Sequence, residues 1–191
     1  MNLLNLIIIA FAILIISEMK ESSNSKSSKK RTLLSTTELF NALSAKGIPK
    51  SSQFIIAAHA AAESFINNKF SSYGFNFWNF GKPSWWENVW HKAYSLVKRN
   101  DDVRNTIGFS NISDAIDGYL LILQRGRPSA YSEIRKESPD IDAFLASLCP
   151  SHYGQTGNSY ASACNSNYAE NINSWYNYYI TNYWSSIIMN S

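Results

Sequence analysis

Residues 54–65 (FIIAAHAAAESF) constrain the fold of this chain more than any other stretch. Alanine and isoleucine fill most of the segment, which predicts a helix buried on nearly all sides. One carboxylate, Glu63, lies near its end. Desolvation favours the neutral form of a carboxyl group, and a neutral carboxyl beside a cleft can donate a proton to a leaving group near pH 7. Glu63 is therefore the first candidate for chemistry, and the alternative is an exposed stripe on an ordinary amphipathic helix.

The length and composition favour one domain and argue against a nucleic-acid-binding protein. The 191 residues leave room for one sizeable core. Charged residues make up only 16% of the chain, and the net charge of +3 arises from a basic tract at residues 20–31. A nucleic-acid-binding domain normally carries a basic face on its folded part, so we expect no nucleic-acid partner. Aromatic residues reach 14%, which suits stacking on sugar rings as well as core packing.

The N-terminal segment has the pattern of an export signal. Residues 3–16 form an apolar run that only Asn5 interrupts. At about 14 residues this run is shorter than the roughly 20 needed to span a bilayer, which predicts a signal peptide at residues 1–17 and a secreted protein. Lysines follow the run rather than precede it, so a membrane anchor formed by residues 3–16 is the alternative.

The remainder divides into a linker and a domain. Residues 18–34 are rich in Ser and Lys and lack an apolar period, which predicts a flexible linker before a domain at residues 35–185. Cys149 and Cys164 are the only cysteines, and such a pair in an exported domain most often forms a disulfide. We expect neither a metal site nor a cofactor, and we expect a monomer.

Capping and periodicity predict a mainly α-helical domain. Ser35 and Glu38 form a capping pattern for a helix that ends near Ala45, and Ser51 or Ser52 is expected to cap the helix of Glu63. The aromatic segment at residues 73–87 is expected to be a loop or irregular hairpin lining a groove, with packing under the helices as the alternative. Residues 89–110 fit either a strand pair or short helices. Further helices are predicted at residues 111–126, 131–136, 140–148 and 167–184.

Four sequence blocks occur in order along this domain. They are IIAAHAAAES at residues 55–64, NFWNFGK at 76–82, SDAIDGY at 113–119, and SYA at 159–161 followed by NYAENI at 167–172. Together they resemble the glucosaminidase family of peptidoglycan hydrolases, glycoside hydrolase family 73, and the likeness covers roughly residues 35–182. His59 replaces the family's usual Gln, and the family's S-G-W-G continuation is missing after Glu63. Two extra residues, including Cys164, separate Tyr160 from Tyr168.

The resemblance implies both a fold and an activity. It implies a lysozyme-like helical domain with a small irregular or β-hairpin lobe across a groove. The implied activity is that of an endo-β-N-acetylglucosaminidase acting on peptidoglycan or a related GlcNAc-containing glycan. Glu63 falls on the family's catalytic glutamate, and Tyr160 falls on a tyrosine near the active site, with Tyr153 as the alternative. Tyr168 is expected to pack on the last helix, and His59 either contacts Glu63 or is a core histidine.

A second catalytic group is less well defined by the sequence. Glycosidases usually pair two carboxylates about 5 to 9.5 Å apart. Glu87 is the first choice because tryptophans flank it. Asp101 and Asp102 compete with it, although a solvated turn explains this pair better than catalysis does. Asp114 is better explained as a helix cap. If no second carboxylate is in place, the N-acetyl group of the substrate can act as the nucleophile, which leaves Glu63 as the sole essential acid.

The predicted substrate-binding residues come mostly from the aromatic segment, where rings can stack on GlcNAc or wall the groove. They are Trp78, Asn79, Phe80, Trp85, Trp86 and Tyr153. A lytic transglycosylase or muramidase on the same scaffold is the closest alternative activity. A non-catalytic glycan-binding or adhesion module is the alternative from another class, and the altered residues after Glu63 favour it.

Overall fold

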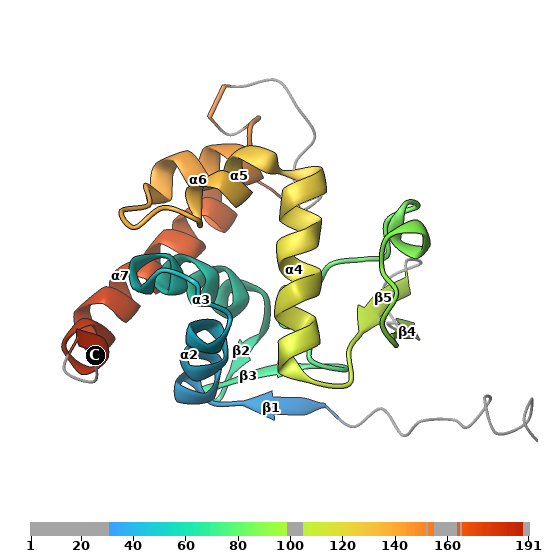
Figure 1. The fold of residues 1–191 in the computed structure, drawn as a ribbon. Helices are drawn as coiled ribbons and strands as arrows, with labels where there is room; N and C mark the ends of the chain where they lie inside the picture. Colours follow the sequence, from blue (N-terminus) through green and yellow to red (C-terminus); the bar gives the residue numbers. More distant parts are fainter. Residues whose placement is uncertain (1–30, 99–104, 152, 155–163, 165, 189–191) are drawn as a thin grey trace, which may run out of the picture. The chain divides into compact units, whose positions relative to one another are not determined.

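The structure is a computed structural model that describes residues 31–98, 105–151, 153–154, 164 and 166–188. Over these residues the chain is mainly helical and carries two small antiparallel sheets (Figure 1). The predicted signal peptide and most of the predicted linker lie outside the described residues. The expectation of a mainly α-helical domain is confirmed.

Helix α3 (Lys50–Ser64) is the central element of this domain. Its residues 52–61 are all buried, and α2 (Thr36–Ala45) and α7 (Ser166–Ile188) pack against it (Figure 1). A helix that is apolar around most of its circumference must be covered on several sides. The prediction of a helix buried on nearly all sides is therefore confirmed.

The start of α3 differs from the predicted serine cap. Pro49 is the N-cap residue and makes no side-chain cap bond. Ser51 and Ser52 lie inside the first turn, where their hydroxyls donate to the carbonyls of Glu137 and Lys136, the latter over 3.0 Å. These hydroxyls therefore join α3 to the segment that follows α5 (Pro128–Glu133) instead of capping their own helix.

The other helices begin mostly where capping residues predict. Ser35 and Glu38 form a reciprocal capping box on α2. The Ser35 hydroxyl and backbone N–H both donate to the Glu38 carboxylate, which lowers the pKa of Glu38. Asn111 caps α4 (Ile112–Gly126), and Asp140 caps α6 (Ile141–Leu148). Helix α5 begins at Pro128, earlier than the predicted residue 131, because proline is favoured in the first turn of a helix.

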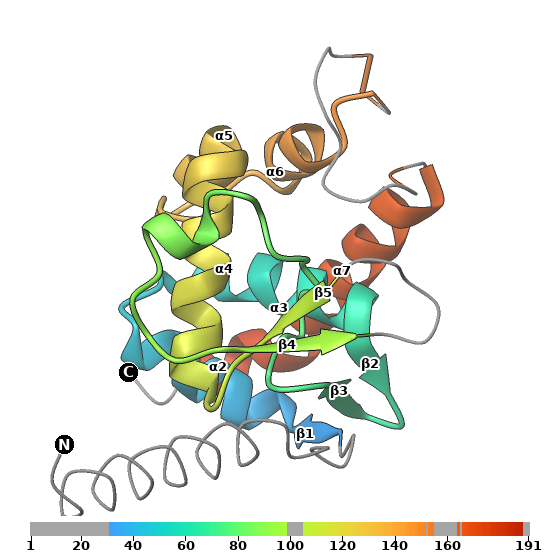
Figure 2. The same ribbon diagram turned by 90° about the vertical axis from the view of Figure 1, so that its right-hand side faces the viewer.

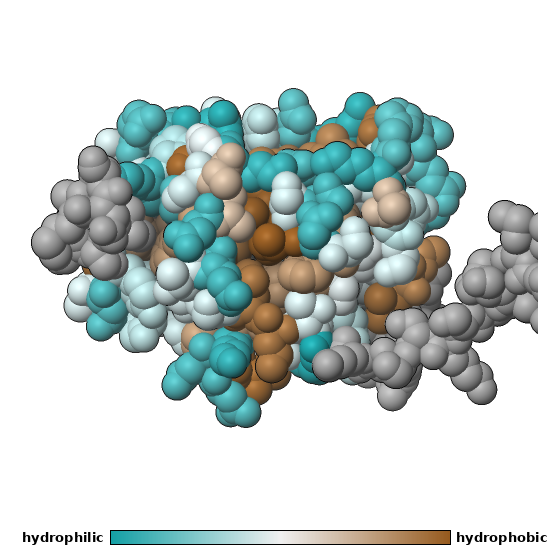
Figure 3. Space-filling model, turned by 60° about the horizontal axis from the view of Figure 1, so that its bottom comes forward, coloured by the Kyte–Doolittle hydropathy of each residue, from teal (hydrophilic) through white to brown (hydrophobic). Residues whose placement is uncertain are grey.

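A three-stranded sheet precedes and follows α3 in the chain. Its strands β1 (Thr32–Leu34), β3 (Lys69–Ser72) and β2 (Phe65–Ile66) lie in that order and are antiparallel. β1 falls within the predicted linker, so the ordered domain begins before residue 35; Leu34 is buried and secures this strand. Apolar residues gather across the middle of the face that carries this sheet (Figure 3).

A two-stranded hairpin forms the second sheet. Strands β4 (Ser95–Lys98) and β5 (Asn105–Gly108) pair antiparallel, with Leu96 opposite Ile107. Of the two structures predicted for residues 89–110, the strand pair is therefore the one observed. The short 3₁₀ helix η1 (Trp86–Asn88) precedes the hairpin within an otherwise irregular aromatic segment, as predicted.

Two further findings bear on the predicted organisation. Cys149, at the end of α6, forms a disulfide with Cys164, with their Cα atoms 5.3 Å apart, so the predicted pairing is confirmed. Of the helices in the described ranges, none combines the length and the apolar character needed to cross a membrane.

Gly118 allows α4 to approach the aromatic cluster. A Cβ atom at this position would lie 2.5 Å from the ring of Phe109 and 3.2 Å from that of Trp86. Both rings are buried, so neither can move without disturbing the core. Glycine has a low helix propensity, but at position 118 it allows the helix to pack closely against these two rings.

We predict that Gly118→Ala destabilises the protein by about 1–3 kcal/mol, because overpacking outweighs the better helix propensity of alanine. The control is Gly126→Ala in the same helix, where no atom lies within 4 Å of the added Cβ. That variant should be neutral or up to about 1 kcal/mol more stable. Urea unfolding of both variants tests this, and a stabilised Gly118→Ala protein would show that the aromatic cluster is loosely packed.

Candidate active site

A pocket of about 80 Å³ lies beside the C-terminal end of α3. Figure 2 shows both small sheets on this side of the helix, and strands β3, β4 and β5 all contribute to the pocket wall. Its described lining residues are Arg31, Glu63, Ser64, Ser71, Ser72, Tyr73, Asn76, Asn79, Val97 and Thr106. Among them Glu63 is the only carboxylate.

Both carboxylate oxygens of Glu63 accept hydrogen bonds. The Tyr168 hydroxyl, from α7, donates to Oε1 over 2.6 Å. The side-chain amide of Asn79 donates to Oε2 over 3.3 Å. Glu63 is itself partly buried. One partner on each oxygen fixes the plane of the carboxylate at the pocket wall, as a group that transfers a proton in a defined direction requires.

A chain of hydrogen bonds continues behind Tyr168. Its hydroxyl lies 3.1 Å from Nε2 of His59, and Nδ1 of His59 lies 3.0 Å from the Tyr119 hydroxyl. His59 has no exposed surface, and this burial lowers its pKa to about 3, so its ring is neutral at neutral pH. Burial also raises the pKa of Tyr119, which keeps its proton.

The donor and acceptor roles in this chain follow from the neutral ring. A neutral imidazole donates from one nitrogen and accepts at the other. When Tyr168 donates to Glu63, its oxygen is left to accept from Nε2–H of His59. Nδ1 then accepts from Tyr119. When Tyr168 donates to Glu63, each donor in the chain therefore points toward Glu63, from Tyr119 through His59 and Tyr168. This direction is assigned from the hydrogen-bond partners.

Local sequence explains why these groups meet. His59 and Glu63 are four residues apart and so lie on the same face of α3. Tyr119, on α4, stacks on Trp78 with ring centroids 4.4 Å apart. The Trp78 ring nitrogen donates to the Ile56 carbonyl over 3.1 Å. Trp78 therefore supports Tyr119 from behind and connects α4 to α3.

The loop that presents Asn79 is held by Asn76. The buried Asn76 amide donates to the carbonyls of Phe80 and Ile107, each over 2.9 Å, and its oxygen accepts from the Phe80 backbone over 3.3 Å. Asn79 adopts a φ of 53°, a left-handed conformation that asparagine tolerates better than most residues. The N-x-x-N spacing thus builds a tight turn that aims Asn79 at Glu63.

The aromatic residues predicted to bind substrate lie mostly in the core. Trp78 and Trp86 are fully buried, and Phe80 is 5% exposed. The prediction that these three rings stack on sugars is wrong, because packing under the helices covers their faces. Trp85 is half-buried beneath Arg125, whose guanidinium carbon lies 5.5 Å from the ring centroid.

The remaining predicted binding residues divide between the pocket and the surface. Tyr153 is exposed, and neither it nor Trp85 lines the pocket. Asn79 does line it and contacts Glu63. The prediction that Asn79 binds substrate remains a prediction, although its position suits that role.

The candidates for a second carboxylate lie apart from this wall. Glu87 is exposed on η1, and hydrogen bonds from Lys82 and Tyr94 lower its pKa. It is absent from the described pocket lining. Asp114 accepts from Asn111, the actual N-cap residue of α4, and pairs with Lys92 over 2.8 Å. Asp101, Asp102 and the predicted catalytic Tyr160 lie outside the described residues.

Sequence reasoning missed several members of the site, of which Tyr168 and Arg31 bear most on its chemistry. Tyr168 was expected only to pack, yet it binds Glu63 across a separation of 105 residues. Its place in the fourth block was the available signal. Arg31 fell in the predicted linker and lines the pocket. His59 is a core histidine whose ring nitrogens contact two tyrosines, which was one of its two expected roles.

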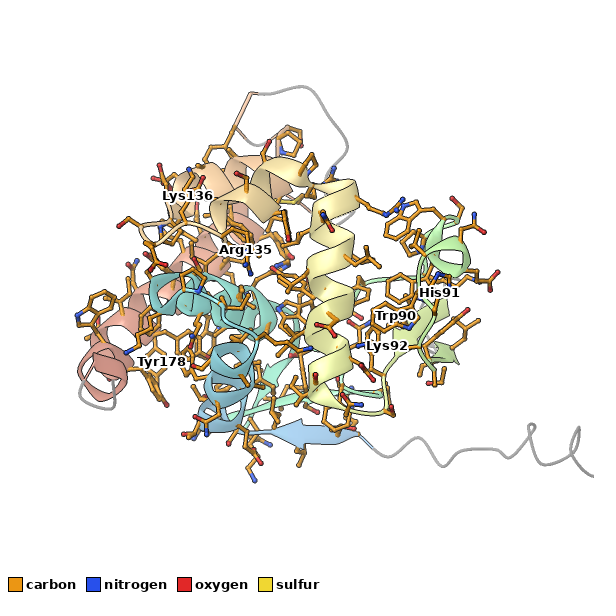
Figure 4. The ribbon with its side chains drawn as sticks, viewed as in Figure 1. Trp90, His91, Lys92, Arg135, Lys136 and Tyr178 are labelled. Carbon is orange, nitrogen blue, oxygen red and sulfur yellow. A yellow bond between two sulfur atoms is a disulfide. The ribbon has the colours of Figure 1, made fainter. Side chains whose placement is uncertain are left out.

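A larger, shallower groove lies between residues 89–92 and α4. Figure 4 shows Trp90, His91 and Lys92 beside this helix. Its carboxylate, Asp117, is engaged by Lys46 over 2.6 Å and by Lys92 over 2.7 Å. An acid held between two cations is poorly suited to donate a proton, so the pocket at Glu63 is the better candidate for catalysis.

The described ranges contain no cluster of three or more His, Cys, Asp or Glu residues that could hold a metal ion. No protein-family model matches the chain, and no curated protein or solved structure matches it either. A functional assignment therefore depends on the chemistry of the site and on the four sequence blocks.

We predict that burial of neutral His59 makes the protein less stable in mild acid. The unfolded chain binds a proton at this residue below about pH 6.5, whereas the folded protein does not until about pH 3. Its contribution to stability is therefore complete above pH 6.5 and is lost as the pH falls, at up to about 1.4 kcal/mol per pH unit.

The measurement is urea unfolding of the wild type and His59→Gln between pH 7.5 and 4.5. Glutamine keeps a donor and an acceptor but does not titrate, so the variant should lose less stability over this range. Equal pH slopes for the two proteins would contradict a neutral, buried His59.

Proposed function

We propose that the protein is an exported glycoside hydrolase that cuts the glycan strand of peptidoglycan. The activity is that of an endo-β-N-acetylglucosaminidase with Glu63 as the general acid. The scaffold is a lysozyme-like helical domain in which the two small sheets form the lobe beside the groove. The observation that carries the proposal is the Glu63 carboxylate, held at a pocket wall by Tyr168 and Asn79.

The meeting of the four sequence blocks supports this proposal. Glu63 comes from the first block, Asn79 from the second, Tyr119 from the third and Tyr168 from the fourth. They form one connected set of hydrogen bonds through His59. These residues are spread over more than a hundred positions, and chance matches would not be expected to meet at one site. Their meeting therefore favours a catalytic architecture like that of the family that the blocks resemble.

The hydrogen-bonded chain suits the two states that a general acid must adopt. Protonated Glu63 can donate to the Tyr168 oxygen or to the glycosidic oxygen of a bound glycan. After the proton moves to the leaving group, the Tyr168 hydroxyl donates to Oε1 and stabilises the carboxylate. His59 can follow this reversal by exchanging tautomers while it stays neutral.

The second catalytic role has two routes. Val97 and Thr106 line the pocket on the two strands joined by the segment that contains Asp101 and Asp102, so either aspartate is a candidate partner. Alternatively, the N-acetyl group of the substrate attacks the anomeric carbon. Glu87 is the weaker choice because Lys82 and Tyr94 already engage it.

A lytic transglycosylase is the second candidate, and the single carboxylate in the described lining favours it. In that reaction Glu63 protonates the leaving oxygen. As a carboxylate it then accepts the proton of the substrate's own C6 hydroxyl, whose oxygen bonds to C1. Mass spectrometry separates the two activities, because hydrolysis gives reducing ends and the intramolecular reaction gives 1,6-anhydro ends.

We predict that Glu63→Gln lowers the release of new sugar ends from purified peptidoglycan by about 10²–10⁴-fold, because the amide cannot supply the proton. The matched control is Glu170→Gln, an exposed glutamate on α7 that should leave the rate unchanged. Full activity in Glu63→Gln would contradict the assignment of Glu63 as the general acid. Binding to peptidoglycan without new ends in the wild type would favour a non-catalytic glycan-binding or adhesion module.

Tyr168→Phe tests the positioning of Glu63. Loss of a hydrogen bond to a charged group costs about 1.5–3 kcal/mol, so kcat should fall roughly 10- to 100-fold. The alkaline limb of the pH–rate profile should also move to higher pH, because the tyrosine hydroxyl stabilises ionised Glu63 and the general acid must be protonated. An unchanged profile together with an unchanged kcat would show that Tyr168 only packs.

A further inference from the structure

Arg31 places a cation at the same pocket as Glu63. It directly precedes β1, and its Nη1 donates to the Ser71 hydroxyl over 3.3 Å. Its guanidinium carbon lies 5.1 Å from the centroid of the Tyr73 ring. Ser71 and Tyr73 both line the pocket, so two contacts hold the guanidinium at the wall.

This guanidinium has unused capacity to donate. Within the described part of the chain Arg31 has no carboxylate partner, whereas Lys46, Lys82, Lys92 and Lys136 each pair with an acid. A guanidinium carries five N–H donors in a planar fork, and one of them binds Ser71. The remaining donors can bind both oxygens of a carboxylate.

Ser72 provides a second, independent indication of a ligand. Ser72 is one of the residues that line the pocket, and it is only 8% exposed. Its hydroxyl has no hydrogen-bond partner among the described residues. Leaving a buried hydroxyl without a hydrogen-bond partner destabilises a protein, and a ligand oxygen in the pocket would supply the missing partner.

We propose that Arg31 and Ser72 form a subsite for a carboxylate carried by the glycan, which makes the site selective for acidic muramyl glycans over neutral GlcNAc polymers. The inference rests on the proposed function, since it names a feature of the substrate at the Glu63 pocket. A singly charged carboxylate fits better than a doubly charged phosphate, because Glu63 lines the same pocket and, once it has given up its proton, repels added negative charge.

The carboxylate has two chemical sources in peptidoglycan. The lactyl group of MurNAc is a free carboxylate where the stem peptide has been removed. Where the peptide is attached, the lactyl carbonyl is an amide and the peptide itself supplies carboxylates. Both sources offer the same planar pair of oxygens to Arg31.

The test is the dissociation constant of the full-length protein for four glycan fragments, measured by calorimetry. They are a GlcNAc tetrasaccharide, a GlcNAc–MurNAc tetrasaccharide with free lactyl groups, the same fragment with its carboxyls reduced to alcohols, and the fragment bearing stem peptides. At least one acidic fragment should bind about tenfold or more tightly than the reduced one. The acidic fragment that shows the preference identifies the source.

Variants of the subsite residues test whether the preference for acidic fragments arises there. Arg31→Gln should remove the preference, Arg31→Lys should keep part of it, and Ser72→Ala should weaken it. Lys69→Gln, on the same strand as Ser72 but outside the described pocket lining, is the charge control and should keep the preference. Thermal unfolding of each variant checks that the fold is retained.

Equal binding of acidic and reduced fragments, or no binding of any fragment, would overturn the subsite. A preference that survives in Arg31→Gln would also overturn it. The proposed catalysis fails separately, if Glu63→Gln keeps full activity on peptidoglycan. In that case a preference lost in Arg31→Gln would still establish the subsite on a glycan-binding protein.

Discussion

The hydrogen bond from Tyr168 to Glu63 is the contact on which the site depends. It joins α7 to the end of α3, so the orientation of the Glu63 carboxylate requires that the two helices pack correctly along their length. The buried surface of α3 makes this packing possible, because a helix of alanine and isoleucine lets its neighbours approach closely. Core packing and carboxylate geometry are therefore consequences of the same helix.

The hydrogen-bonded chain behind Glu63 lies in the core, where burying polar groups destabilises the fold unless they are bonded. His59 and Tyr119 have no exposed surface, and buried polar groups weaken a core unless they are bonded. Here each ring nitrogen of His59 has a tyrosine partner, so the chain is satisfied. A satisfied network is rigid, and rigidity holds an acid in one orientation.

Local signals predicted much of the fold. The capping box at Ser35, the Asn111 cap and the disulfide could be deduced from short spacings because each depends on nearby residues or on a single possible pair. Strand β1 could not be deduced from the sequence, because three residues are too few to show an alternating apolar pattern. The isolation of Glu63 in an apolar helix made it a candidate, and the four sequence blocks singled it out as the site carboxylate. Trp78 and Trp86 were misassigned because composition does not distinguish a ring that stacks on sugar from one that fills a core, and Tyr168 was missed because its partner is remote in sequence.

The central claim is that Glu63 faces the bond that is cut. A crystal structure of Glu63→Gln with a bound muramyl glycan tests this most directly, because the amide should slow turnover and retain the substrate. The claim predicts a glycosidic oxygen within about 2.6–3.2 Å of the residue 63 side chain. A glycan bound instead in the groove lined by Trp90 and Leu120, with the pocket at residue 63 unoccupied, would contradict it.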